Sequence, residues 1–194
     1  MKLILASGSP QRAALLDQLG LVYEMRPADL DESQRPDEGA GDYVERLARE
    51  KARSAVDDGS VVVAADTAIA HEGHILGKPA HPAEAKSMLR RLQGNVHEVF
   101  TGVAVAWGDE IRSLVDVTDV RMMAMTDEEI ADYVDSGEPM DKAGSYALQG
   151  RGGVFVESIS GSPFTVIGLP IHLLPRLLAQ AGPGFYHFIR PGGH

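Results

Sequence analysis

The sequence contains no cysteine, which excludes a disulfide framework, a thiolate-bound zinc and a thiol nucleophile. It also lacks any apolar run near the roughly 20 residues that a membrane-spanning helix needs. The short apolar run at residues 1–6 leads straight into Ser7-Gly8-Ser9-Pro10, which is not the pattern of a signal peptide. From these absences we expect a cytoplasmic protein that binds no membrane.

Positive charge is scarce as well: the chain has 18 Lys and Arg residues but 28 Asp and Glu residues, which gives a formal net charge of −10. Long nucleic acids are bound by neutralising many phosphates, so we exclude them as partners. A small polyanion can still be bound where a few cations converge. There are only five lysines, and three of them lie in the motifs below, which indicates placement for function: Lys2, Lys51, Lys78, Lys86 and Lys142.

The chain of 194 residues is long enough to bury a sizeable core without disulfides or a structural metal. No internal repeat, low-complexity block or linker interrupts it. We therefore expect one domain over residues 1–182, followed by a loosely held, Gly/Pro-rich tail at 183–194.

Strand and helix patterns alternate along the chain, which predicts an α/β fold with a mixed sheet. Strands are expected at 3–6, 61–65, 97–107, 111–122 and 154–159, with a hairpin at 67–76 around Glu72-Gly73. Helices are expected to begin at Pro10 after a Ser9 cap, at Tyr43 after an Asp42 cap, at Pro82, after a Thr126–Glu129 capping box, and at Pro170. The helix at Pro82 is expected to bury four apolar residues, namely Ala85, Met88, Leu89 and Leu92.

The turn after the first strand is made of small residues and leads into a helix that carries Arg12. A helix N-terminus presents unpaired N–H groups and a positive dipole end, and an arginine adds a planar charged fork. Ser7, Ser9 and Arg12 are therefore a candidate phosphate site. Taken alone, the segment also fits an ordinary capped helix with a surface arginine, because such caps are common.

Asp66 and Thr67 follow the buried strand at 61–65, at the edge where ligand chemistry gathers in α/β sheets. A carboxylate there can bind a metal or accept a proton from water, although it also fits an aspartate that caps a turn. Lys51 lies on the apolar stripe of the helix at 43–56. It either points into a cleft toward phosphate or packs its stem and keeps its ammonium group in water.

The remaining candidates lie on predicted loops. Lys78 stands between a glycine and a proline, and Lys142 and Gln149 lie in glycine-containing loops, where a lysine can bind phosphate and an amide can recognise the edge of a pyrimidine. Glu32, in an acidic loop, is a candidate second metal carboxylate. Each also fits a solvated loop residue. The seven histidines show no metal-ligand spacing, and there is no Gly-x-Ser-x-Gly elbow or Walker loop.

Taken in order, these segments resemble the Maf-like nucleotide pyrophosphatases. The matching stretches extend from residue 3 to about residue 178, and they are 5–12, 47–52, 65–67, 75–79, 97–103, 137–146, 149–150 and 166–170. Several separate blocks in one order are far more specific than any single block. The resemblance implies an elongated α/β fold with two lobes and a central cleft, shared with the inosine-triphosphate pyrophosphatases. It also implies hydrolysis between the α- and β-phosphates, and a homodimer.

The resemblance also implies roles for individual residues. Asp66 matches the family's proton acceptor, and three residues match its phosphate-binding cations: Arg12, Lys51 and Lys78. Thr67 and Gln149 match positions tied to base choice. Together with Asp66 and the block at 141–149 they are similar to the branch that prefers dTTP and UTP, whereas the 7-methyl-GTP branch tends to carry Asp-Gln and a glutamate there.

One residue departs from the family pattern, because Gln11 stands where the family often has the first of two arginines. That position is tied to specificity, so the dTTP/UTP preference is less firmly implied than the pyrophosphatase activity.

The expected mechanism is attack of water on the α-phosphorus, with pyrophosphate as the leaving group. A divalent cation (Mg, Mn or Co), held by Asp66 and by Glu32, lowers the pKa of that water while the cationic side chains neutralise the triphosphate. Whether Asp66 is the base or a metal ligand stays open. Two alternatives also stay open, namely a house-cleaning pyrophosphatase for modified nucleotides and a non-catalytic nucleotide-binding regulator of septum formation.

Overall fold

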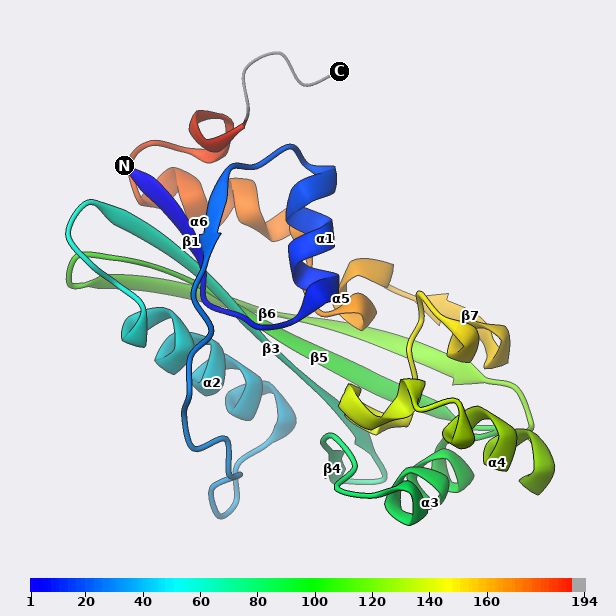
Figure 1. The fold of residues 1–194 in the computed structure, drawn as a ribbon. Helices are drawn as coiled ribbons and strands as arrows, with labels where there is room; N and C mark the ends of the chain where they lie inside the picture. Colours follow the sequence, from blue (N-terminus) through cyan, green and yellow to red (C-terminus); the bar gives the residue numbers. More distant parts are fainter. Residues whose placement is uncertain (190–194) are drawn as a thin grey trace. The chain divides into compact units, whose positions relative to one another are not determined.

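A computed structural model describes residues 1–189 and shows an α/β fold built on one sheet (Figure 1). The main path of the sheet runs through β2 (Tyr23–Met25), β1 (Lys2–Leu5), β3 (Ser60–His71), β5 (Val96–Trp107), β6 (Glu110–Met122) and β7 (Val156–Ser160), and β4 (His74–Leu76) pairs with β3 off this path. β1 pairs in parallel with β2 and β3, whereas β3–β4 and β6–β7 are antiparallel. The predicted α/β class with a mixed sheet is confirmed.

The chain divides into two compact units. The first comprises Met1–Asp66, Thr101–Asp116 and the chain from Gly168 on, and the second comprises Thr67–Phe100 and Val117–Ile167. β3, β5 and β6 contribute residues to both. The predicted single domain over residues 1–182 and the predicted cleft between two lobes stay predictions.

Two helix starts in the first unit test the predicted caps. α1 (Pro10–Gln18) begins with proline at its first position, but the Ser9 side chain does not cap it and donates to Gln11 Oε1 instead. α2 (Ala40–Ser54) begins three residues before the predicted start, after Gly39. The Asp42 cap was therefore wrong, and this carboxylate lies in the first turn, where it still favours the helix dipole.

The strand expected at 61–65, with Asp66 directly after it, continues to His71, so its predicted end was wrong. β1 pairs with Ser60–Val63 and β4 pairs with Ile69–His71, and Asp66 lies between these two stretches. The predicted strand and the predicted hairpin arm are thus one continuous strand that changes partners. Asp66 still lies just past the carboxyl end of the parallel β1 pairing.

The second unit follows the predicted local patterns closely. The β3–β4 hairpin turns at Glu72 and Gly73, both with positive φ, as a type I′ hairpin turn requires. α3 (Pro82–Leu92) buries its four predicted apolar residues, and α4 (Asp127–Asp135) begins with the predicted capping box. α5 (Pro163–Ile167) and the 3-10 turns η1 (Glu138–Asp141), η2 (Ala143–Ser145) and η3 (Arg151–Phe155) complete the unit.

The C-terminal segment differs from its prediction. α6 (Leu174–Gln180) follows the 3-10 turn η4 (Ile171–Leu173), so this α-helix begins four residues after Pro170. Within the expected tail, η5 (Phe185–Phe188) buries Phe188, whose carbonyl accepts the Val22 N–H at 2.8 Å. The loosely held tail at 183–194 stays a prediction. Residues 190–194 of that predicted tail lie outside the described residues.

No helix in the described part of the chain combines the length and the apolar character that crossing a bilayer requires.

Candidate active site

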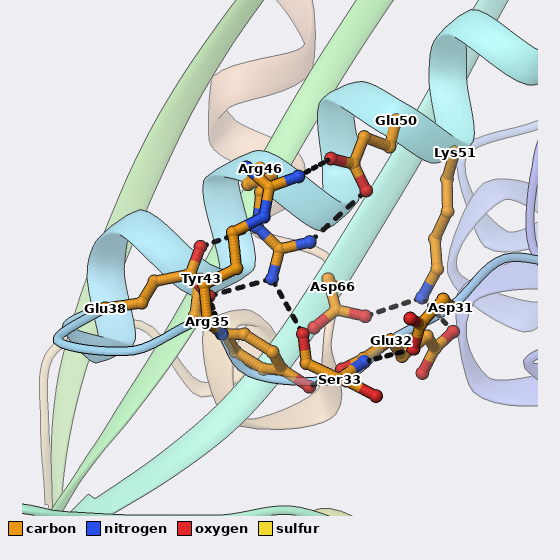
Figure 2. A network of polar contacts seen from close by, with 10 residues as sticks. All are labelled: Asp31, Glu32, Ser33, Arg35, Glu38, Tyr43, Arg46, Glu50, Lys51 and Asp66. Carbon is orange, nitrogen blue, oxygen red and sulfur yellow. Dashed lines mark hydrogen bonds and ion pairs between the residues drawn. The ribbon is translucent and has the colours of Figure 1, made fainter.

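A buried ion pair joins Lys51 of α2 to Asp66 of β3 in the first unit (Figure 2). Lys51 Nζ lies 2.6 Å from Asp66 Oδ1 and 2.7 Å from Oε1 of Glu32, which stands in the loop between β2 and α2. The Lys51 and Asp66 side chains are each 9% exposed, whereas that of Glu32 is 47% exposed. The alternative that Lys51 keeps its ammonium group in water is therefore wrong, and two carboxylates hold it.

Close packing of α2 on the sheet brings Lys51 to Asp66. The buried face of α2 carries the small residues Ala48 and Ala52, which belong to a core cluster with alanines of β3 and β5. At Gly102 of β5 a Cβ atom would lie 2.4 Å from the carbonyl oxygen of Val44 on α2. The helix can approach this strand only because residue 102 has no side chain, which gives a structural reason for the glycine within the matching stretch 97–103.

Arg12 occupies the same unit and is fixed by two hydrogen bonds. Its Nε donates to the Gly168 carbonyl at 2.7 Å, and its Nη1 donates to Ser7 Oγ at 3.2 Å. Ser7 is buried and also accepts the Ser9 N–H at 3.1 Å. Arg12 also interacts electrostatically with Asp66 and Glu32, so this guanidinium lies close enough to the Lys51 pair to act on its charges.

Burial also changes the acidity of this cluster. Burial raises the pKa of the Asp66 carboxyl above its ordinary value, against the opposing effects of Lys51 and Arg12, and Glu32 raises it further. Burial likewise raises the pKa of the Tyr43 phenol to about 12, and the charges of Asp66 and Glu32 act in the same direction. A carboxylate with a raised pKa is a stronger base than an ordinary aspartate, which suits proton transfer from water.

The side chains that hold the Glu32 loop were missed by sequence reasoning. Figure 2 shows Arg46 and Tyr43 of α2 meeting this loop at Glu38, Ser33 and the backbone of Glu32. The loop has no regular period, so no sequence pattern links these residues in advance.

Four further predicted site residues belong to the second unit. Lys78 is exposed, and the carbonyl of the preceding Gly77 accepts the N–H of Gly144 at 3.0 Å, so its turn adjoins the loop that carries Lys142. Lys142 pairs with the neighbouring Asp141. Thr67 is half-buried on β3, directly after Asp66, and Gln149 is exposed.

The segment that carries Gln149 is held at both ends. The Glu138 carboxylate accepts the Gly152 N–H at 3.0 Å and the Tyr133 hydroxyl at 2.8 Å. The Tyr133 hydroxyl in turn accepts the Ala147 N–H at 3.1 Å. The Tyr133 and Glu138 side chains thus fix the backbone on either side of Gln149.

A metal ion would find only part of a ligand set in this cluster. The described residues contain no group of three or more His, Cys, Asp or Glu side chains that could hold a metal ion. Asp66 and Glu32 nevertheless place two carboxylate oxygens around one cation, the Lys51 ammonium group. Magnesium is usually bound by one or two carboxylates together with water and substrate phosphates. The residues therefore fit an ion that arrives with a phosphate, and they do not form a closed protein cage.

Comparison with known proteins gives one consistent family. The model of a family described as Maf-like protein matches residues 2–181. The chain is 50% identical over 186 residues to a dTTP/UTP pyrophosphatase of Anaeromyxobacter dehalogenans (strain 2CP-C), which covers 93% of this chain and 94% of that protein. Identity is 46% over 188 residues with a dTTP/UTP pyrophosphatase of Chromobacterium violaceum, covering 93% and 95% of the two chains. It is 44% over 181 residues with one of Bacillus cereus (strain AH820), covering 92% and 95%.

Among solved structures, the Ham1 protein of Staphylococcus aureus is a partial match, with a TM-score of 0.43 and 12% identity over 63% of this chain and 72% of that one.

Proposed function

This chain belongs to the Maf-like protein family, and we propose that it hydrolyses nucleoside triphosphates, with dTTP and UTP as preferred substrates, to the monophosphate and pyrophosphate. The family match confirms the resemblance seen in the sequence motifs. The observation that carries the proposal is the buried Lys51–Asp66 pair, on a chain whose relatives share the name dTTP/UTP pyrophosphatase over nearly its whole length.

Arg12 and Lys51 supply positive charge for the triphosphate. The Arg12 guanidinium is held by Gly168 and Ser7, so it meets a phosphate in a fixed orientation. Preorganised charges of this kind contribute most of the catalysis in phosphoryl transfer, because little reorganisation is needed as the reaction proceeds. Ser7 and Ser9 of the first unit and Lys78 and Lys142 of the second remain proposed phosphate-binding residues.

Asp66 is proposed to accept the proton of the attacking water. Its Oδ1 is fixed by the Lys51 ammonium group, and burial raises its pKa, so the carboxylate is both oriented and more basic than usual. A divalent cation (Mg, Mn or Co) held by Asp66 and Glu32 would supply Lewis-acid polarisation of the phosphate and a more acidic water.

Base preference is proposed to depend on Gln149, Thr67 and Gln11. The Gln149 amide offers a donor and an acceptor together, as the edge of a uracil or thymine ring requires. Gln11 accepts a hydrogen bond from the Ser9 hydroxyl at 3.1 Å, so an uncharged side chain occupies the position where the family often has arginine.

The test is a panel of common and modified-base triphosphates, each assayed with Mg, Mn and Co, in which pyrophosphate and orthophosphate are measured separately. We expect pyrophosphate release to be fastest from dTTP and UTP. Faster release from modified bases would instead support the house-cleaning alternative. Tight nucleotide binding without turnover would support the regulatory alternative. The mass of the protein in solution tests the proposed homodimer.

A further inference from the structure

The loop that carries Glu32 is attached to α2 by a fork of hydrogen bonds between Arg46 and Glu38 (Figure 2). Arg46 Nε donates to Glu38 Oε1 at 2.5 Å, and Arg46 Nη2 donates to Glu38 Oε2 at 2.8 Å. The two side chains are only 12% and 9% exposed. Two-point pairing of this kind fixes orientation as well as distance, and its low exposure distinguishes it from ordinary surface ion pairs.

Further contacts lead from α2 to the backbone of Glu32. Arg46 Nη2 also donates to the Ser33 carbonyl at 3.1 Å, and the Tyr43 hydroxyl donates to the Glu32 carbonyl at 2.9 Å. The Asp31 carboxylate accepts the Ser33 N–H at 2.9 Å. The same helix therefore carries Lys51 and the groups that hold the backbone of its exposed partner.

Apolar burial does not hold this loop, because every residue from 31 to 37 is exposed. An exposed segment keeps one conformation only where specific contacts offset its conformational entropy. The contacts with the strongest geometry here are those of Arg46, which reaches the loop at Glu38 and Ser33 and also donates to Glu50 of α2.

We propose that Arg46, through Glu38, is a positioning residue that holds the Glu32 carboxylate against Lys51. The proposal rests on the proposed function, because it gives Arg46 an effect on hydrolysis without contact with the substrate. Hydrogen bonding with Arg46 lowers the pKa of Glu38 to about 2, so the fork stays charged at neutral pH. A lysine at this position would keep the charge but lose the planar fork, which makes Arg46→Lys the informative variant.

The first test measures pyrophosphate release in wild type, Arg46→Lys, Glu32→Gln and the double variant. We expect Arg46→Lys to lower kcat/KM by about 10-fold to 100-fold in the wild-type background, as small misplacements of active-site groups do. In the Glu32→Gln background the same change should have less than about a 2-fold effect, because the group that Arg46 positions is already lost. Equal effects in both backgrounds, or no effect in the wild type, would overturn the proposal.

The second test measures hydrogen exchange of the segment 30–39 by mass spectrometry. We expect Arg46→Lys to accelerate exchange in this segment and to leave β3 unchanged. Arg112→Gln serves as the matched control, because Arg112 belongs to an exposed ion pair in the same unit and should change neither exchange nor activity. Unchanged exchange in segment 30–39 would overturn the proposal that Arg46 holds this loop.

Two outcomes need separate interpretation. If Arg46→Lys also accelerates exchange in β3, the variant is globally unstable, and Glu38→Gln replaces it in the same two-background comparison. A wild-type protein that releases no pyrophosphate from any triphosphate would overturn the proposed function. Hydrogen exchange would then test, without any activity measurement, whether Arg46 holds the segment 30–39.

Discussion

The first unit buries Lys51 against Asp66, and the second unit buries His97 of β5 against Tyr146. Both contacts are short, at 2.6 Å between Nζ and Oδ1 and 2.9 Å between His97 Nε2 and the Tyr146 hydroxyl. Their surroundings differ. The first pair is charged and lies in the field of Arg12, whereas Tyr146 belongs to an apolar core cluster and the buried His97 Nδ1 has no hydrogen-bond partner in the described part of the chain.

The difference indicates what each pair is for. A buried ion pair costs desolvation and is weak evidence for stability, so a cluster of buried charges is better explained by chemistry on a charged substrate. A neutral pair inside an apolar core costs much less to bury when it is hydrogen-bonded. We therefore expect changes at Lys51 or Asp66 to act on catalysis, and changes at His97 or Tyr146 to act on stability.

The largest expected effect is that of Asp66→Asn. We expect kcat/KM for dTTP and UTP to fall by about 10³-fold, which corresponds to about 4 kcal/mol of transition-state stabilisation. The fold should persist, because the amide keeps the volume of the side chain and Lys51 keeps Glu32 as a partner. Pyrophosphate release and thermal unfolding of the same sample check both statements. Full activity of Asp66→Asn would exclude Asp66 from the reaction and would contradict the catalytic role that the comparison gives to the Lys51–Asp66 pair.

The next effect is a loss of stability in acid that originates at His97. Burial, with a smaller contribution from His71, lowers the pKa of His97 from 6.5 to about 4. The unfolded chain therefore binds a proton at this residue below about pH 6.5, whereas the folded chain does not until about pH 4. The resulting stability is complete above pH 6.5, and about 3 kcal/mol of it is lost as the pH falls from 6.5 to 4.

Urea unfolding of wild type and His97→Gln between pH 7 and pH 4 measures this loss. Carboxylates titrate in both proteins, so only the difference between them reports on His97. The wild type should lose more free energy of unfolding than the variant over this range. Equal losses would show that burial of His97 has no such consequence.

A smaller effect is expected for Tyr146→Phe. Removing the hydroxyl leaves His97 Nε2 without this partner in addition to the unpaired Nδ1, which costs about 1–2 kcal/mol of unfolding free energy. The kcat of the folded protein should stay unchanged. Chemical denaturation and steady-state kinetics check the two halves. A reduced kcat at unchanged stability would instead assign Tyr146 to the reaction.

The parts that were predicted correctly from the sequence are those that depend on neighbouring residues. The Thr126–Glu129 capping box, the Glu72-Gly73 turn and the apolar face of α3 each involve residues at most a few turns apart. The predicted start of α2 and the predicted end of β3 were wrong. α2 begins earlier, with Gly39 at its N-cap, and β3 extends further because Ile69–His71 pair with β4.

The candidate site was predicted in part for the same reason. The pattern placed Lys51 on an apolar stripe but left its partner open, because Asp66 is 15 residues further on and reaches it only through the packing of α2 on the sheet. No periodic pattern links Arg46 to Glu38, since Arg46 lies on α2 and Glu38 lies in the irregular loop before this helix. His97 was correctly placed near the start of a strand, but its contact with Tyr146, 49 residues away, depends on tertiary packing.

The smallest expected effect is that of Arg90→Gln, which separates the influence of contact distance from that of burial. Arg90 Nε lies 2.7 Å from Asp127 Oδ1, nearly as close as the buried pair, but these side chains are 52% and 79% exposed. Water screens such a pair, so we expect Arg90→Gln to change the free energy of unfolding by less than about 0.5 kcal/mol and to leave kcat/KM unchanged. Urea unfolding at low and high salt measures it. A loss above about 1 kcal/mol would mean that contact distance matters more than burial, and the contrast between Lys51–Asp66 and the rest of the molecule would then need another cause.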